Sequence, residues 1–280
     1  MFMLPIQCSY INLNHATGRR KRFESSFMAH LQGRGFDLLR IPAIDKSAIQ
    51  GPGMYATITD AEMACLQSHR YAILNAMQAN NADKHHMICE DDCKFGEHTA
   101  RLVYQTLEHM RHVDWDIIFT CVAIGNSREL ASLVEVFEHL HPQRLTSFQR
   151  GQDFTFSGAS CYLLNPKSAS KFIALFKSTQ HIDVPIDIFF RNLSHAGLLK
   201  TYFTFPFVTA LDVADCPSYI QTDKLPIGQT LEAVANIYCI NTPDEERQHL
   251  IARMENQIRS DALRAYGAAC ANFRQLSLNR

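Results

Sequence analysis

The 280-residue sequence has no long apolar run and almost no net charge. No window approaches the roughly 20 apolar residues of a membrane-spanning helix, which argues against an integral membrane protein. The formal net charge of −1 excludes a strong overall field that would attract nucleic acid or an anionic membrane. We therefore expect no nucleic-acid partner.

The sequence also has no cysteine pattern that indicates a set of disulfide bonds. The nine cysteines include no C-x-x-C pair, and their odd number argues against a complete disulfide framework. Reduced thiols are typical of the cytosol. The opening residues Met1–Cys8 have no basic segment and only a short, broken apolar run, unlike a signal peptide. We expect a cytoplasmic protein, and leave open peripheral contact with the inner face of a membrane and the oligomeric state.

The composition that is present, 46% hydrophobic and 20% charged, is typical of a soluble globular protein. Strand patterns at 8–13 and 36–41 flank a helical pattern at 19–33, which is the βαβ order of an α/β fold. Further strands are expected at 87–88, 115–119, 145–147, 154–164 and 200–208, and further helices at 59–77, 97–112, 128–140, 165–177 and 183–197.

The last part of the sequence has a different pattern. We predict a main domain over residues 1–224 and an extension over 225–280, with a strand at 235–241 and a charged helix at 243–265. The mixed charge of that helix favours packing on protein rather than on lipid.

Three consecutive carboxylates, Glu90, Asp91 and Asp92, follow the apolar pair Met87-Ile88. On an extended backbone Glu90 and Asp92 point the same way and Asp91 the other. Hard divalent cations such as Mn²⁺ or Mg²⁺ bind through such carboxylates together with substrate phosphates. The alternative is a solvated acidic turn after a strand.

A polar turn with Asn12 follows the first strand, and two arginines, Arg19 and Arg20, lie beyond it. Ligands of α/β folds bind at the carboxyl ends of the strands, so this turn is a reasonable place for a nucleotide phosphate. The alternative for the two arginines is a solvated helix face.

The helix predicted at 59–77 begins with a capping box, in which Thr59 and Glu62 bind each other's amides. Glu62, Cys65 and His69 share one stripe of this helix. Cys65 and His69 suggest a metal pair, but structural zinc needs four ligands and nothing nearby in the sequence completes the set.

Four stretches of the chain, in order and spacing, resemble glycosyltransferase family 25, the lipooligosaccharide galactosyltransferase-like enzymes related to the collagen galactosyltransferases. They are Tyr10-Ile11-Asn12-Leu13 with Arg19-Arg20, Thr59-x-x-Glu62-x-x-Cys65-x-x-Ser68-His69, Ile88-x-Glu90-Asp91-Asp92-x-x-Phe95, and Gly158-Ala159-x-x-Tyr162-Leu163-Leu164. The resemblance covers roughly residues 8–220. Ala64 stands where the family usually has Gly, and Cys89 occupies an aliphatic position.

The resemblance implies a GT-A-like nucleotide-sugar-binding domain, with a mixed central sheet flanked by helices and a helical C-terminal tail. It implies UDP-galactose or a relative as donor, inversion at the anomeric carbon, and a glycan or lipid-linked acceptor. Mn²⁺ or Mg²⁺ would be held by Asp92 with Glu90 or Asp91. The donor-binding residues implied in this way are Asn12, Leu13, Arg19, Arg20, Ser68, His69, Glu90 and Asp91.

An inverting displacement also needs a carboxylate that takes the proton of the attacking hydroxyl. Asp187 is our first candidate for this base, and Asp183 is the second. The alternative for both residues is capping of a helix N-terminus.

Two other functions remain open. One is a catalytically silent relative that binds a sugar nucleotide or a protein, which predicts metal-dependent UDP binding without turnover. The other is a phosphate-processing metalloenzyme, which predicts cleavage of simple phosphoesters without sugar transfer.

Overall fold

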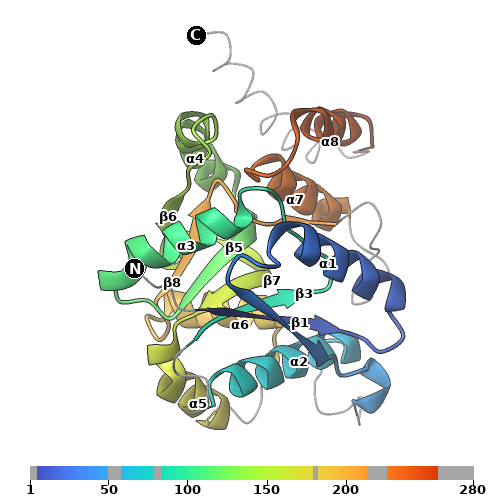
Figure 1. The fold of residues 1–280 in the computed structure, drawn as a ribbon, viewed down its shortest axis with the longest axis vertical. Helices are drawn as coiled ribbons and strands as arrows, with labels where there is room; N and C mark the ends of the chain where they lie inside the picture. The colour runs from blue at the N-terminus through green and yellow to red at the C-terminus, as the bar shows by residue number, and fades with distance from the viewer. Residues whose placement is uncertain (1–4, 50–57, 79–83, 179–181, 213–225, 258–280) are drawn as a thin grey trace.

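The computed structural model describes residues 5–49, 58–78, 84–178, 182–212 and 226–257 and has a central seven-stranded sheet (Figure 1). The strand order is β2-β1-β3-β7-β5-β8-β6. The strands are β1 Ile6–Asn12, β2 Phe36–Pro42, β3 His85–Glu90, β5 Ile117–Ile124, β6 Ser147–Arg150, β7 Phe156–Leu164 and β8 Thr201–Phe205. β1 is parallel to β2 and β3, β5 is parallel to β8, and β7 is antiparallel to both β3 and β5. The predicted mixed α/β sheet is confirmed.

Helices cover both faces of this sheet, with α1 and α3 on one side and α2 and α5 on the other (Figure 1). The helices are α1 Thr17–His30, α2 Asp60–Ala76, α3 Thr99–His109, α4 Ser127–Leu140, α5 Ala169–Ser178, α6 Ile186–His195, α7 Pro226–Ile237 and α8 Asp244–Gln257. Among the helices of the described ranges, none has the length and hydrophobicity needed to cross a bilayer.

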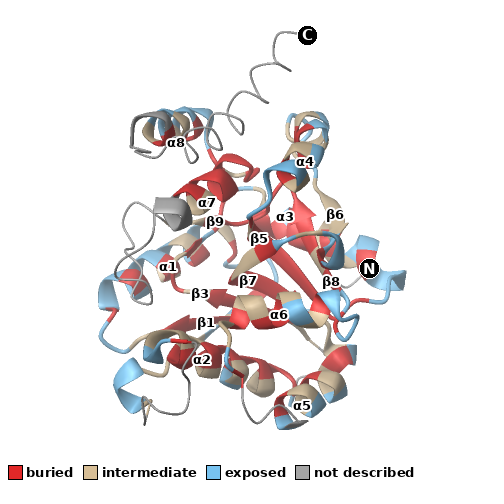
Figure 2. Ribbon diagram, turned by 180° about the vertical axis from the view of Figure 1, so that it is seen from behind, coloured by how far each residue is buried: buried red, intermediate tan, exposed pale blue. Residues whose placement is uncertain are grey.

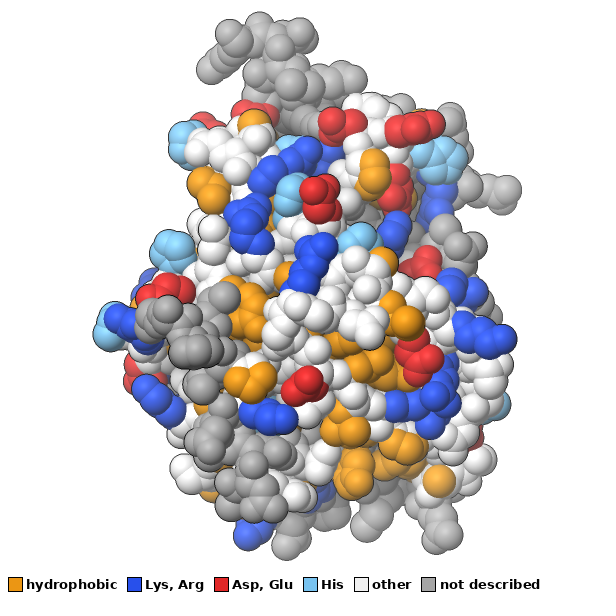
Figure 3. Space-filling model, in the orientation of Figure 1, with side chains coloured by type: hydrophobic (Ala, Val, Ile, Leu, Met, Phe, Trp, Pro, Cys, Tyr) orange, Lys and Arg blue, Asp and Glu red, His pale blue; other side chains and the backbone are white. Residues whose placement is uncertain are grey.

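The two faces of the sheet bury separate hydrophobic cores, and the strands at its centre are buried almost throughout (Figure 2). Met87 and Cys89 of β3 pack with α1 and α3, whereas Ile88 between them packs with α2. This alternation is the two-residue period of a strand, with both faces apolar because both are covered. On the face in Figure 3, basic and acidic side chains are interspersed.

A short second sheet follows the three carboxylates. β4 (Cys93–Lys94) pairs antiparallel with β9 (Ala210–Leu211), and the Asp212 amide donates to the Asp92 carbonyl at 2.8 Å. The chain just beyond Asp92 is therefore fixed by hydrogen bonds to a segment more than 100 residues away.

The strand predicted at 235–241 is wrong. Ala235–Ile237 form the end of α7, and beyond it Cys239 makes an isolated parallel bridge with Phe207. Val234, Ala235 and Ile237 are buried. Residues 233–240 are all buried, the polar Asn236 included. Because no side of this segment is exposed, periodicity cannot separate a buried helix from a buried strand, and the burial of α7 against β5 decides its structure.

The predicted boundary between residues 224 and 225 lies outside the described residues. Beyond it, the Asn241 side chain donates to the Val208 carbonyl at 2.7 Å and accepts from the His98 amide at 3.0 Å. Arg247 is fully buried and donates to the carbonyls of Ile237 and Cys239 at 2.7 and 3.0 Å. The charged helix, described from Asp244 to Gln257, thus packs on protein through a buried charge.

Several other predictions are confirmed with shifted ends. The capping box of α2 is present, since Thr59 Oγ1 accepts from the Glu62 amide at 3.2 Å and Glu62 Oε2 accepts from the Thr59 amide at 2.8 Å. The helix expected at 165–177 opens as a 3₁₀ turn, Pro166–Ser168, and the strand expected at 145–147 forms instead at 147–150.

Candidate active site

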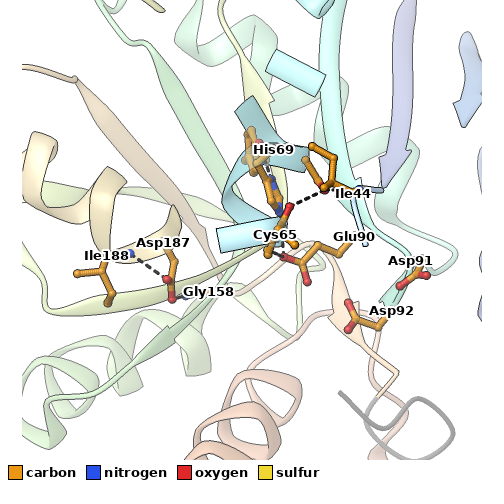
Figure 4. Close-up of polar contacts among 12 residues, drawn as sticks. Ile44, Cys65, His69, Glu90, Asp91, Asp92, Gly158, Asp187 and Ile188 are labelled. Carbon is orange, nitrogen blue, oxygen red and sulfur yellow. Dashed lines mark hydrogen bonds and ion pairs between the residues drawn. The ribbon is translucent and has the colours of Figure 1, made fainter. Parts of the chain in front are cut away.

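Two cavities meet at the carboxyl ends of β1 and β3, where ligands bind in α/β folds. Their volumes are about 310 and 380 Å³, and Cys65, Glu90 and Asp92 line both. The first cavity extends toward β1 and the start of α1, and the second toward β7, α6 and α7. In the view of Figure 4, His69 and Cys65 lie between Asp187 on one side and Glu90 and Asp92 on the other.

Asp91 is a buried carboxylate held by two side chains of the first βα unit. Asp91 Oδ1 accepts from Arg19 Nη2 at 2.6 Å, and Asp91 Oδ2 accepts from Asn12 Nδ2 at 2.6 Å. Asn12 Oδ1 in turn accepts from Arg40 Nε at 3.0 Å. Burial raises the pKa of Asp91, and the charge of Arg19 opposes this rise. Asp91 therefore holds the turn between β1 and α1.

Asp92 shares the same arginine but faces both cavities. Asp92 Oδ2 lies 2.7 Å from Arg19 Nη2, whereas its Oδ1 is buried and has no hydrogen-bond partner among the described residues. Burial, and then the neighbouring Glu90 charge, raise the pKa of Asp92 to about 7. A buried carboxylate oxygen without a donor, beside a second carboxylate, suits a hard divalent cation.

Glu90 contacts two residues of α2. Glu90 Oε1 lies 3.0 Å from His69 Nε2 and 3.9 Å from Cys65 Sγ. His69 is fully buried and its Nδ1 lies 2.9 Å from the Tyr162 hydroxyl. Cys65, His69 and Glu90 thus form a three-ligand group with ligand atoms within 4.8 Å of one another. The third ligand comes from β3, which the spacing on α2 could not reveal.

Ser68 positions the loop that covers the first cavity. Its hydroxyl donates to the Ala64 carbonyl at 2.7 Å and accepts from the Ile44 amide at 2.8 Å. Ser68 and Leu13 line this cavity together with Ile44. The hydroxyl of Ser68 therefore ties α2 to the segment after β2.

Arg20 lies apart from the other predicted donor-binding residues. Its Nε donates to Glu24 Oε1 at 2.9 Å, and Glu24 also accepts from the Tyr10 hydroxyl at 2.5 Å. Arg20 does not line either cavity. Successive helical residues are rotated by about 100°, so only Arg19 of this pair faces the carboxylates.

The two candidate bases have different surroundings in the structure. Asp187, in the first turn of α6, lines the second cavity, whereas Asp183 is exposed and lies outside both cavities. Asp187 Oδ2 accepts from the Gly158 amide at 2.8 Å, and Oδ1 accepts from the Ile188 amide at 2.9 Å (Figure 4). Gly158 has φ of +91°, a conformation that favours glycine.

Helix capping does not fully account for Asp187. The N-cap residue of α6 is Pro185, and it makes no side-chain cap. Although Asp187 accepts from one amide of the first turn, its other oxygen joins α6 to β7 through Gly158. Its carboxylate is therefore fixed at the cavity wall.

Two residues of this site have no clear signal in the sequence. Glu232 of α7 lines the second cavity, and Tyr162 orients His69 from β7. Glu232 follows the three carboxylates by about 140 residues and belongs to no local pattern. Tyr162 lies in one of the stretches of the resemblance, but its contact with His69 needs the pairing of β3 with β7.

The sequence matches the model of glycosyltransferase family 25 (LPS biosynthesis protein) over residues 8–190. No curated protein matches the chain. The matched span includes Asn12, Arg19, the three carboxylates and Asp187, and it ends before β8, β9, α7 and α8.

Proposed function

The chain belongs to glycosyltransferase family 25, and we propose that this glycosyltransferase moves a hexose, galactose from UDP-galactose, onto a glycan or lipooligosaccharide acceptor with inversion. The observation that carries the proposal is the pair of cavities that share Glu90 and Asp92 as a common wall. Such an arrangement suits a reaction in which a donor and an acceptor meet at a cluster of carboxylates.

The first cavity has the chemistry of a nucleotide site. Arg19 and Lys46 contribute positive charge to its lining. Its apolar lining consists of Ile11, Leu13, Ala43, Ile44, Ala61 and Ala64. Apolar walls suit a flat base, and guanidinium or ammonium groups suit phosphate oxygens. We therefore assign this cavity to the nucleotide of the donor.

A divalent cation, Mn²⁺ or Mg²⁺, fits the shared wall. Asp92 would hold it through Oδ1, with Glu90 beside it, because Asp92 Oδ1 is buried without a hydrogen-bond partner in the described part of the chain. When bound, such a cation neutralises the charge that develops on a leaving diphosphate. Arg19, which lines the first cavity beside Asp92, can donate to the same phosphate oxygens.

Asp187 is the group that can accept the proton in the second cavity. As the acceptor hydroxyl oxygen attacks the anomeric carbon, its proton moves to a carboxylate oxygen of Asp187, and the bond to the leaving diphosphate breaks. The amides of Gly158 and Ile188 hold that carboxylate in one orientation. A single displacement of this kind inverts the anomeric centre.

The test is calorimetric binding of a nucleotide-sugar panel, with Mn²⁺ or with EDTA, to the wild-type chain, Asp92→Asn and Asp187→Asn. We expect metal-dependent binding of a UDP-hexose that Asp92→Asn weakens at least about tenfold. Asp187→Asn should retain donor binding and lose transfer. Asp183→Asn is the matched control and should retain both.

Two results would overturn the proposal. A folded wild-type chain that binds no nucleotide sugar with either metal ion would exclude the donor site. Metal-dependent UDP binding without transfer to any glycan acceptor would instead indicate a silent relative.

A further inference from the structure

Helix α7 brings a carboxylate into the second cavity from outside the span that matches the family. Glu232, which is half-buried, and its neighbour Leu231 line this cavity opposite the residues of β7 and α6. The charge of Glu232 also contributes to the raised pKa of Asp92, after burial and the nearer charges of the cluster. Glu232 is therefore part of the electrostatic surroundings of the site.

A chain of hydrogen bonds fixes α7 relative to the three carboxylates. The side chain of Asn236, one turn after Glu232, accepts from the Leu211 amide at 2.8 Å and donates to the Leu211 carbonyl at 2.7 Å. Leu211 belongs to β9, which pairs with β4 directly after Asp92, and the Asp212 amide donates to the Asp92 carbonyl. The position of Glu232 is thus tied to that of Asp92.

Carboxylates line both cavities, but the first also has Arg19 and Lys46 in its lining. The carboxylates of the second cavity come from four segments of the chain, and no Lys or Arg is among the described residues that line it. They are Glu62, Glu90, Asp92, Asp187 and Glu232. A divalent cation at Asp92 would offset two of these five charges, and Arg19, which contacts Asp92, is shared with Asp91. A carboxylate or phosphate brought into this cavity would meet like charges without a partner, which is costly in a partly dehydrated site.

We propose that the second cavity binds an acceptor sugar that is uncharged or carries an amine, and that it excludes sugars with a carboxylate or phosphate at the bound residue. Glu232 accepts hydrogen bonds from the hydroxyl or amine groups of this sugar and is a specificity-determining residue. The inference rests on the proposed function, because it takes the second cavity as the acceptor side.

The experiment uses three methyl glycosides that differ in charge on the same ring: the glucoside, the glucosaminide and the glucuronide, each repeated in the galacto series. Their dissociation constants are measured by saturation-transfer NMR on the full chain saturated with Mg²⁺ and UDP. We expect the uncharged and amine-bearing glycosides to bind at least about tenfold more tightly than the acidic one. Glu232→Gln should reduce the ratio of the acidic glycoside's dissociation constant to that of the uncharged glycoside severalfold.

Glu245→Gln is the matched control, because it removes the same charge from an exposed position of α8 outside the cavity. Glu245→Gln should leave the ratio of these dissociation constants unchanged. Three results would each overturn the inference. The acidic glycosides could bind as tightly as the others, Glu232→Gln could leave the ratio of dissociation constants unchanged, or no glycoside could bind. Failure of UDP and metal to bind would instead overturn the proposed function, so the two failures are distinct.

Discussion

Arg19 and Arg20 are adjacent in the sequence but have opposite surroundings. Arg19 is buried and contacts both Asp91 and Asp92, whereas the side chain of Arg20 is 48% exposed and pairs with Glu24. Removing Arg19 leaves buried carboxylates without their charge partner, and we expect Arg19→Ala to lower the free energy of unfolding by about 3 kcal/mol. Arg20→Ala breaks an exposed pair and should lower it by less than about 1 kcal/mol.

Urea denaturation of both variants in EDTA measures these free energies. Equal losses in the two variants would show that the contacts of Arg19 with the two carboxylates do not stabilise the fold.

Asp92 gives the metal-free protein a pH dependence with a definite sign. Its pKa is raised from 3.8 to about 7, so the folded chain holds this proton more tightly than the unfolded chain does. As the pH rises, the unfolded chain ionises first, and the contribution of Asp92 to the free energy of unfolding falls between about pH 4 and pH 7 and then levels off. Asp92→Asn removes this contribution.

The melting temperatures of the wild-type chain and Asp92→Asn, measured in EDTA from pH 4.5 to 8, check this expectation. The variant should gain stability relative to wild type as the pH rises. A difference that is the same at every pH would contradict the raised pKa. Asp153→Asn, a change at a carboxylate outside both cavities, is the control.

Individual residues of the site were predictable only where a local rule applied. The extended backbone that the alternation of Glu90, Asp91 and Asp92 assumed ends at Glu90. Asp91 and Asp92 lie in the turn after β3 and both bind Arg19, so they do not point in opposite directions as predicted. The sequence could not separate Arg19 from Arg20, because that depends on the angle at which α1 begins. It also could not reveal Glu232, because no local pattern relates α7 to β3.

At the scale of elements, the side chain of Asn236 joins α7 to β9 through two hydrogen bonds. Asn236 is buried, and its side-chain amide accepts from the Leu211 amide and donates to the Leu211 carbonyl. Asn236→Ala removes the side-chain partner of the half-buried amide and carbonyl of Leu211, so we expect a loss of about 2 kcal/mol in the free energy of unfolding. Asn192→Ala, at an exposed position of α6, should change it by less than about 0.5 kcal/mol.

Hydrogen exchange of the β9 amides distinguishes this attachment from a general loss of stability. We expect Asn236→Ala to speed exchange at Leu211 more than at the central strand β7. Uniform acceleration along both strands would contradict a local role for Asn236.

Elements were predictable from periodicity where one face was polar. The capping box and the stripe of α2 are examples, and the first βαβ unit is another. The end of α7 was misassigned because its residues are buried on all sides, so that the contact with β5 rather than periodicity distinguishes helix from strand.

At the scale of the whole molecule, the C-terminal helices are joined to the sheet by buried polar contacts. Arg247 donates to the carbonyl of Cys239, which bridges Phe207, and Asn241 donates to the carbonyl of Val208. We therefore expect a single cooperative unfolding transition. Trp115, the only tryptophan, is buried two residues before β5 begins.

Trp115 fluorescence and far-UV circular dichroism should give the same midpoint, and Arg247→Met should shift both midpoints together. Two separate transitions, with Trp115 unaffected by the Arg247 change, would favour the two-domain division at residue 224.

The strand order was beyond the reach of sequence reasoning. A two-residue period shows that a segment is a strand, but it does not name its neighbours. β7 lies between β3 and β5 although it follows both in the sequence, and this insertion makes the sheet mixed.

The same topology sets the order in which a growing chain can complete its site. Arg19, the three carboxylates and Asp187 are synthesised first, and Glu232 follows Asp187 by 45 residues. At about 5–20 residues per second this delay is about 2–9 s. β7 must also emerge before β1 and β3 can join β5 in one sheet. During translation, the residues of the proposed nucleotide site are therefore synthesised before Glu232 of the proposed acceptor site.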